Sequence, residues 1–373
     1  MKVGIITYHG AYNYGSALQA FSLFHAVKSE GHEAEIINYR TDRQDRLYRM
    51  YTKPNGLMDM MRNAQTFVNR RKMKEHRAGF DRFIAEHTVL SGSEIRTPEA
   101  LRTLNSVYDC FICGSDQVWN PNCVDFDVSY LLDFVTDKKK CFSYAPSIAS
   151  EALGEAWHEI FRDELTGFSD LSVREESGAK IIADITGRQV ETVLDPVFLL
   201  DRADWRPFIK ESSQAYILGY FIGDIPGMRD YAEALGRRYS LPVVVINKNL
   251  RDLRMKCVKR YESGPEEFVD LVVNAKAVCS NSFHAMAFSL IFDREFHVFV
   301  DNVHANTARR RITDLLQDLG MKDRLVDSRL QLLPPMRDAD FDHHDKLDSR
   351  IRFSKRYLQD ALARVDAYGR GRS

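Results

Sequence analysis

The sequence predicts an α/β protein made of two Rossmann-like domains that face a cleft. At 373 residues the chain is longer than one hydrophobic core usually supports. Short apolar runs alternate with amphipathic segments along most of its length, which is typical of parallel sheets covered by helices. This alternation starts at "VGIITY" near the N-terminus and starts again at "AYILGYFIGD", residues 215–224.

The expected domain boundaries follow from the second start. We expect an N-terminal domain over residues 1–206 and a C-terminal domain over 214–345, joined through the polar stretch "KESSQ". Residues 346–373 are expected to form a helix that packs back on the N-terminal domain. Its apolar positions recur at helical spacing and are Ile351, Leu358, Leu362 and Val365.

The first forty residues give the clearest local prediction. "VGIITY" is typical of a buried strand, "HGAYNYGS" of a polar loop, and "ALQAFSLFHAVKSEG" of a helix that ends at Gly31. The strand "EAEIINY" follows, so a right-handed βαβ crossover is expected. The loop contains no GxGxxG motif and the second strand ends in Tyr39-Arg40 instead of an acidic residue, which argues against an NAD site.

Composition and charge limit the partners of this chain. The net charge is −1, from 52 basic and 53 acidic residues, so no overall field favours nucleic acid and any anion recognition is local. We expect a cytoplasmic protein because the N-terminus lacks a signal-peptide pattern and no run of about 18 apolar residues is present. The six cysteines fit a reducing compartment.

No metal site is expected. Cys110 and Cys113 are three positions apart on an expected strand, so their side chains point to opposite faces and are interpreted as core residues. The acidic and histidine-rich stretch "DADFDHHDKLD", residues 338–348, matches no ligand spacing and is interpreted as a solvated turn.

Residues 56–90 form a strongly basic segment of helical character. We interpret it as a solvated face with an aromatic stripe, formed by Phe67, Phe80 and Phe83, that holds the helix to the sheet. The alternative is a surface for peripheral contact with the inner face of a membrane.

Polar side chains follow several of the expected strands. In a parallel sheet these positions share the carboxyl edge, where α/β proteins collect their functional groups. The residues are Asp116, Gln117, Ser143, Ser147, Arg174 and Asp195.

Five segments together carry a resemblance to a known family. "NYGSALQAFSL", "YDCFICGSDQVWNP", "LSVREESG", "LDPVFLL" and "SNSFHAMAFSLIF" occur in this order between about Lys2 and Leu319. In combination they resemble the polysaccharide pyruvyl transferase family of exopolysaccharide biosynthesis. The resemblance implies a fold similar to the GT-B glycosyltransferases. It also implies transfer of the carboxyethylidene group of phosphoenolpyruvate to sugar hydroxyls, so the expected partners are this donor, with no cofactor, and a glycan or lipid-linked saccharide acceptor.

The same resemblance suggests residue roles. Arg174, in "SVRE", is expected to bind the phosphate or carboxylate of phosphoenolpyruvate. The alternative is that it pairs with Glu175, Glu176 or Asp195 and braces the strand ends.

His284 is expected in the first turn of a helix, where it can carry a proton near neutral pH, or it is a satisfied buried histidine. The family often has Arg-x-His at this turn, whereas this chain has Ser282. Ser282 is expected to offer its hydroxyl and amide instead, and Arg309 or Arg311 in "NTARRRITDLL" to supply the missing charge.

The remaining candidates lie in the N-terminal half. Asp116 is expected either to act as the base on the acceptor hydroxyl or to cap the next helix. Asn13, Gly15 and Gln117 are expected to bind substrate.

Two rival functions share these features. A GT-B-type glycosyltransferase would bind a nucleotide-sugar instead of phosphoenolpyruvate. A non-catalytic scaffold of a glycan-assembly complex would keep its function after substitution of Arg174 or His284.

Overall fold

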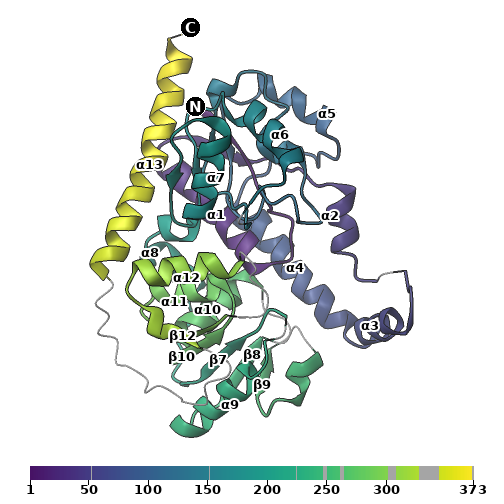
Figure 1. The fold of residues 1–373 in the computed structure, drawn as a ribbon. Helices are drawn as coiled ribbons and strands as arrows, with labels where there is room; N and C mark the ends of the chain where they lie inside the picture. Colours follow the sequence, from purple (N-terminus) through teal and green to yellow (C-terminus); the bar gives the residue numbers. More distant parts are fainter. Residues whose placement is uncertain are drawn as a thin grey trace. The chain divides into compact units, whose positions relative to one another are not determined.

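A computed structural model describes most of the chain (Figure 1). The chain folds into two compact units. The described residues are 1–51, 53–150, 152–223, 225–246, 250–260, 264–300, 308–326 and 344–371. The first unit comprises Met1–Val68, Asp81–Leu200 and Ser349–Ser373. The second comprises Asn69–Phe80 and Asp201–Asp348.

The first unit is built on a parallel sheet with the strand order β2-β1-β3-β4. These strands are β1 (Lys2–Ile6), β2 (Glu33–Ile36), β3 (Cys110–Cys113) and β4 (Cys141–Ser143). A parallel pair, β5 (Ser172–Val173) and β6 (Glu191–Thr192), continues from β4. The hydroxyls of Ser143 and Ser172 make this connection, because each donates to the backbone carbonyl of the other at 2.8 and 2.7 Å. The predicted series of parallel strands is confirmed.

Helices cover both faces of this sheet. The α-helices are α1 (Tyr14–Ser29), α2 (Asp42–Leu47), α3 (Leu57–Val68), α4 (Arg70–His87, shared with the second unit), α5 (Pro98–Leu101), α6 (Glu155–Leu165), α7 (Glu176–Thr186) and α13 (His344–Arg370). The short 3₁₀ helices are η1 (Arg102–Ser106), η2 (Val128–Leu131), η3 (Lys138–Lys140) and η4 (Pro196–Leu199). Gly31 follows α1 with a φ of 83°, as its predicted left-handed role requires.

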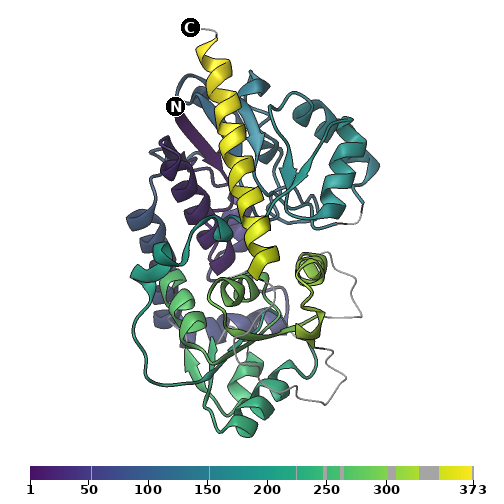
Figure 2. The ribbon, with the colours of Figure 1, turned by 90° about the vertical axis from the view of Figure 1, so that its left-hand side faces the viewer.

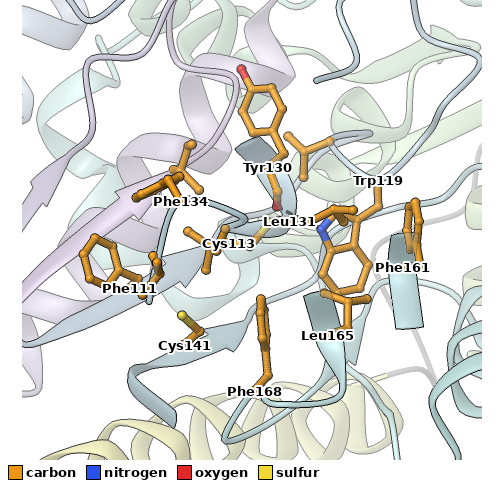
Figure 3. Packing of buried hydrophobic residues seen from close by; sticks show 14 of the residues in the cluster. Phe111, Cys113, Trp119, Tyr130, Leu131, Phe134, Cys141, Phe161, Leu165 and Phe168 are labelled. Atoms are coloured by element: carbon orange, nitrogen blue, oxygen red, sulfur yellow. Dashed lines mark hydrogen bonds between the residues drawn. The ribbon is translucent and has the colours of Figure 1, made fainter. Parts of the chain in front are cut away.

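Two hydrophobic clusters lie on the two faces of the sheet. Cys110 belongs to the cluster under α1 and α13, and Cys113 belongs to the cluster under α6 and α7. The prediction that these two cysteines point to opposite faces is therefore confirmed. α13 contributes Tyr357, Leu358, Ala361, Leu362 and Val365 to the first cluster. Figure 2 shows this helix as the long yellow segment that ends at the C-terminus. Figure 3 shows the Trp119 ring of the second cluster beside Phe161 and Leu165. The indole nitrogen of Trp119 donates to the Tyr130 carbonyl oxygen at 3.1 Å.

The second unit is a doubly wound parallel sheet with the order β9-β8-β7-β10-β11-β12. Its strands are β7 (Ile217–Tyr220), β8 (Val243–Ile246), β9 (Val258–Arg260), β10 (Ala277–Ser280), β11 (Glu295–Phe299) and β12 (Leu325–Val326). Its helices are α8 (Arg202–Trp205), η5 (Arg206–Phe208), α9 (Met228–Tyr239), η6 (Leu250–Arg254), α10 (Pro265–Asn274), α11 (Phe283–Ile291), α12 (Ala308–Asp318) and η7 (Lys322–Arg324). After β9 the chain returns to β7, the first strand of this sheet, and adds β10 on its other side, as a Rossmann-like domain does.

The basic segment predicted over 56–90 forms two helices, α3 and α4. Phe83 is buried and packs on Phe21 at a ring-centroid distance of 5.3 Å, as a core-facing stripe requires. Phe67 is 59 % exposed, so its assignment to that stripe is wrong. Among the described residues, no helix combines the length and apolar character needed to cross a bilayer.

A buried polar network crosses the second unit. The Glu295 carboxylate forms an ion pair with Arg324, and His297 Nε2 lies 3.5 Å from Glu295 Oε1. The Tyr231 hydroxyl lies 3.0 Å from His297 Nδ1. Burial, assisted by the charge of Arg324, lowers the pKa of His297 to about 3. The imidazole is therefore neutral in the folded protein at neutral pH.

We expect this histidine to make the protein less stable in mild acid. Between its ordinary pKa of about 6.5 and the lowered value, the unfolded chain binds a proton that the folded chain rejects. The free energy of unfolding should fall by about 1.4 kcal/mol for each pH unit lost in this window. Urea unfolding between pH 7 and pH 5 measures the slope, and His297→Gln should make it shallower by that amount. The control is His158→Gln on α6, and equal slopes for wild type and His297→Gln would contradict the expectation.

Candidate functional site

The strand order of the first unit reverses between β1 and β3. At such a switch point, the loops that leave the carboxyl ends of the two strands diverge and ligands bind beside them. The loop after β1 leads to Asn13 and α1, and the loop after β3 carries Asp116. Three of the predicted site residues come from these two loops, and they are Asn13, Asp116 and Gln117, while Gly15 lies in the first turn of α1.

Asp116 is the centre of this cluster. Its backbone has a φ of 75°, which a non-glycine residue rarely adopts. Its carboxylate accepts hydrogen bonds from the Ser16 hydroxyl at 2.5 Å and from the Gln117 amide at 2.9 Å. No helix begins in residues 117–127, so the alternative that Asp116 caps a helix is wrong. The carboxylate is held in place and half-buried, which is compatible with a base at the edge of the site.

Asn13 and Gly15 closely precede Ser16, whose hydroxyl donates to the Asp116 carboxylate. The predicted loop over residues 9–16 is shorter than expected, because α1 already begins at Tyr14. The Asn13 side chain accepts a hydrogen bond from the Gly15 amide at 2.9 Å and caps the helix. Gln117 is partly exposed, and its side-chain oxygen Oε1 accepts from the side-chain amide of Asn120 at 3.0 Å. Their substrate contacts stay a prediction.

Arg174 is part of a buried ion pair. Its Nη2 lies 2.8 Å from Asp195 Oδ2, and the exposed fractions of the two side chains are 2 % and 0 %. The same nitrogen donates to the Ser115 hydroxyl. This is the geometry of the bracing alternative, with Asp195 as the partner. A ligand role for Arg174 requires the pair to rearrange and stays a prediction.

Glu175 is a buried residue whose structural role the sequence did not indicate. Its Oε1 accepts from the Ser147 hydroxyl at 2.7 Å and from the Ala149 amide at 3.0 Å. It therefore fixes the loop after β4 against the loop after β5. Its position in "SVRE" was the available signal, but the motif alone does not tell a structural carboxylate from a ligand.

A second carboxyl group accompanies Asp116. Asp125 is buried, and its pKa is raised by burial and by the negative charge of Asp116. Burial likewise raises the pKa of the Tyr8 and Tyr48 hydroxyls, with Asp125 contributing to both shifts. Two carboxyls in unlike environments are the usual arrangement for dividing acid and base roles. Asp125 lies in an irregular loop and belongs to no motif, so sequence reasoning missed it.

The second unit has its own switch point between β7 and β10. The Asn281 side chain ties the two strands together, since its Oδ1 accepts from the Ile222 amide at 2.8 Å and its amide donates to the Ile222 carbonyl. Ser282 caps α11, because its hydroxyl accepts from the Ala285 amide at 3.4 Å. The Ser282 amide donates to the Ser280 hydroxyl at 3.0 Å. The groups that Ser282 was expected to offer to a ligand thus also have structural partners.

His284 lies in the first turn of α11 and is 8 % exposed. Its ring lies 5.3 Å from the Phe283 ring. The Arg311 guanidinium, from α12, lies over the Phe283 ring, 5.6 Å from the centroid of that ring. The structure therefore brings Ser282, His284 and Arg311 to one helix N-terminus. The Arg309 side chain and residues 338–343 of the acidic stretch lie outside the part of the chain that is described.

Two doubly wound parallel sheets place the chain in the GT-B-like class of α/β proteins. UDP-GlcNAc 2-epimerase from Neisseria meningitidis, bound to UDP-GlcNAc, aligns with a TM-score of 0.51 and 10 % identity over 97 % of this chain and 100 % of that chain. The corresponding enzyme from Rickettsia bellii aligns with a TM-score of 0.47 and 12 % identity over 99 % and 98 %. At these identities the similarity concerns the fold alone. A search of curated proteins finds no match.

The chain belongs to the polysaccharide pyruvyl transferase family, whose model matches residues 13–302. The match begins at Asn13 and ends beyond His284, so it includes the candidate residues Asn13, Asp116 and His284. The predicted resemblance is confirmed. Arg309 and Arg311 lie just past its end.

The buried pair should be far more important for stability than a surface pair. Asp195→Asn leaves the Arg174 charge buried without its counter-charge, so we expect the free energy of unfolding to fall by about 3–5 kcal/mol. The double variant Arg174→Met/Asp195→Leu should lose less free energy of unfolding than the sum of the losses of the single variants Arg174→Met and Asp195→Leu. A double-mutant cycle by urea unfolding measures both effects.

The control is the exposed pair Arg71–Glu75 on α4, where the exposed fractions are 90 % and 44 %. Its coupling should not exceed about 0.5 kcal/mol. A similar value for Arg174 and Asp195 would show that they do not brace the sheet.

Proposed function

We propose that this protein transfers the pyruvyl group of phosphoenolpyruvate to two hydroxyls of a sugar and forms a pyruvate ketal. The acceptor would be a cell-surface polysaccharide or its lipid-linked precursor. The observation that carries this proposal is the family match over residues 13–302. The side chains gathered at the two switch points support it, because they include the cation, acid and base that the reaction needs.

Two sugar hydroxyls form bonds to the central carbon of phosphoenolpyruvate, and the bond from this carbon to the phosphate oxygen breaks. The two hydroxyls release two protons. One proton is taken up by the methylene carbon, which becomes a methyl group, and the other leaves with phosphate or solvent. The enzyme must therefore provide a base, a proton donor and a site for a highly anionic donor.

We assign phosphoenolpyruvate to the N-terminus of α11. The positive end of the helix dipole favours an anion there, and the Arg311 guanidinium lies over the neighbouring Phe283 ring. In this assignment Arg311 replaces the arginine that the family's pattern has at position 282. His284 would deliver the proton to the methylene carbon.

We assign the acceptor hydroxyl to Asp116. Its carboxylate is oriented by Ser16 and by the Gln117 amide, so it can take a proton with little reorganisation. Asp125 accompanies it, and burial raises the pKa of this carboxyl, so it keeps a proton to higher pH than an exposed aspartate does. Asn13 and Gln117 would bind other hydroxyls of the sugar. We place this reaction in the cytoplasm, at the inner face of the membrane when the acceptor is lipid-linked.

Phosphoenolpyruvate should stabilise the folded protein against heat. A ligand that binds only the native state raises the free energy of unfolding by about 2.7 kcal/mol at one hundred times its Kd. Differential scanning fluorimetry with phosphoenolpyruvate and a panel of nucleotide-sugars measures the shift. Arg311→Met and His284→Gln should reduce the shift with phosphoenolpyruvate.

The matched control is Arg237→Met, which removes a 70 % exposed arginine of α9 and should keep the full shift. Arg174→Lys is included to test whether that residue also contacts the donor. A shift with a nucleotide-sugar but none with phosphoenolpyruvate would overturn the proposal in favour of a glycosyltransferase.

A further inference from the structure

A cavity of about 580 Å³ lies in the first unit, beside α13. Asp170 borders it just before β5 starts, and Glu191 borders it at the first residue of β6. The cavity is therefore at the amino ends of these two strands. Arg174 and Asp195 follow the carboxyl ends of the same strands, so the cavity is distinct from the candidate active site.

One face of α13 forms a wall of the cavity. Phe353, Arg356, Asp360 and Arg364 recur at spacings of three and four residues, which places them along one side of the helix. Phe353 is 42 % exposed. The helix thus buries one face in the core and presents an aromatic ring and charged groups along the next.

Much of the positive charge of this cavity is already neutralised or bonded. Arg364 binds Asp170 through two contacts, Nη2 to Oδ1 at 2.6 Å and Nε to Oδ2 at 3.0 Å. Arg188 donates to the backbone carbonyls of Thr166 and Ser169, each at 3.0 Å. The three arginines of the lining are matched by three carboxylates. A polyphosphate or nucleic acid needs a surplus of cations, so such ligands fit this cavity poorly.

The other groups of the lining suit a sugar. Arg356 offers donors, Asp360 offers acceptors, and Phe353 offers an exposed ring. The Glu191 carboxylate accepts from the Gln189 side chain and orients that amide in the lining. A saccharide hydroxyl both donates and accepts, and the C–H face of a sugar ring packs on an aromatic side chain. A hydrocarbon ligand would need a mainly apolar lining, which these charged groups do not provide. The volume lies within the range of sites that enclose small ligands.

We propose that this cavity is a secondary saccharide site that binds a neutral stretch of the glycan acceptor away from the reacting hydroxyls. The inference rests on the proposed function for the identity of the glycan, but not for the existence of the site. Binding at a second point would raise the effective concentration of a long acceptor at the active site. It would make the enzyme prefer polymeric or oligosaccharide acceptors to single sugars.

Isothermal titration calorimetry with neutral tetrasaccharides of glucose, galactose and mannose tests the proposal on the full chain. We expect at least one of them to bind, and Phe353→Ala or Arg356→Ala to weaken its binding at least tenfold. The matched control is Arg352→Ala, an exposed arginine of the same helix that does not line the cavity. Because Phe353 and Arg356 are exposed, we expect the variants to fold, and their melting temperatures check this.

Each outcome is decisive. Absence of binding by all three tetrasaccharides, or equal loss in Arg352→Ala, overturns the secondary site. Binding of uridine diphosphate that depends on Arg356 overturns it in favour of an anion site. The thermal shift with phosphoenolpyruvate should persist in Phe353→Ala and Arg356→Ala. If that shift is absent from wild type while the tetrasaccharide still binds, the proposed function fails and the saccharide site stands.

Discussion

The buried ion pair between Arg174 and Asp195 is the interaction on which the first unit depends. It joins the residues that follow β5 and β6, and Arg174 also donates to Ser115 after β3. Ser115 in turn donates to the Ala145 carbonyl at 2.9 Å, and its own carbonyl accepts from the Thr7 hydroxyl at 3.0 Å. One connected network therefore fixes the carboxyl ends of five strands. The position of Asp116, next to Ser115, is a consequence of this network.

In the second unit a neutral side chain, Asn281, fixes the strand ends. Asn281 bonds both backbone groups of Ile222 and thereby fixes the ends of β7 and β10 where the sheet reverses. Ser282 then starts α11, and His284 is placed in the first turn. Polar side chains therefore fix the switch point in both units: Ser115 and Arg174 in the first, and Asn281 in the second. The candidate catalytic residue follows closely in the sequence, Asp116 in the first unit and His284 in the second. This explains why the motifs include strand ends and the first turns of the helices that follow them.

The sequence was informative where burial and periodicity determine the structure. Strands such as β3 and β10 are short apolar runs, so a series of parallel strands and the opposite orientation of Cys110 and Cys113 could be predicted. Contacts between distant segments could not be predicted in this way. An acidic residue in an irregular loop, such as Asp125, carries no periodic signal, and its pKa depends on burial by residues remote in the chain. Likewise, Asn13 starts α1 early through a local hydrogen bond, and the polar face of α13 resembles an ordinary solvated face.

The most direct test of pyruvyl transfer is a transfer assay with phosphoenolpyruvate labelled with ¹³C at the central carbon, run on an oligosaccharide acceptor and followed by NMR. If the protein transfers the pyruvyl group, the label moves from an enol carbon to a ketal carbon attached to the sugar, with one phosphate released per ketal. In deuterated water the new methyl group should gain one deuterium, and His284→Gln should slow this gain at least a hundredfold. Label that stays in phosphoenolpyruvate while a nucleotide-sugar is consumed would rule out pyruvyl transfer.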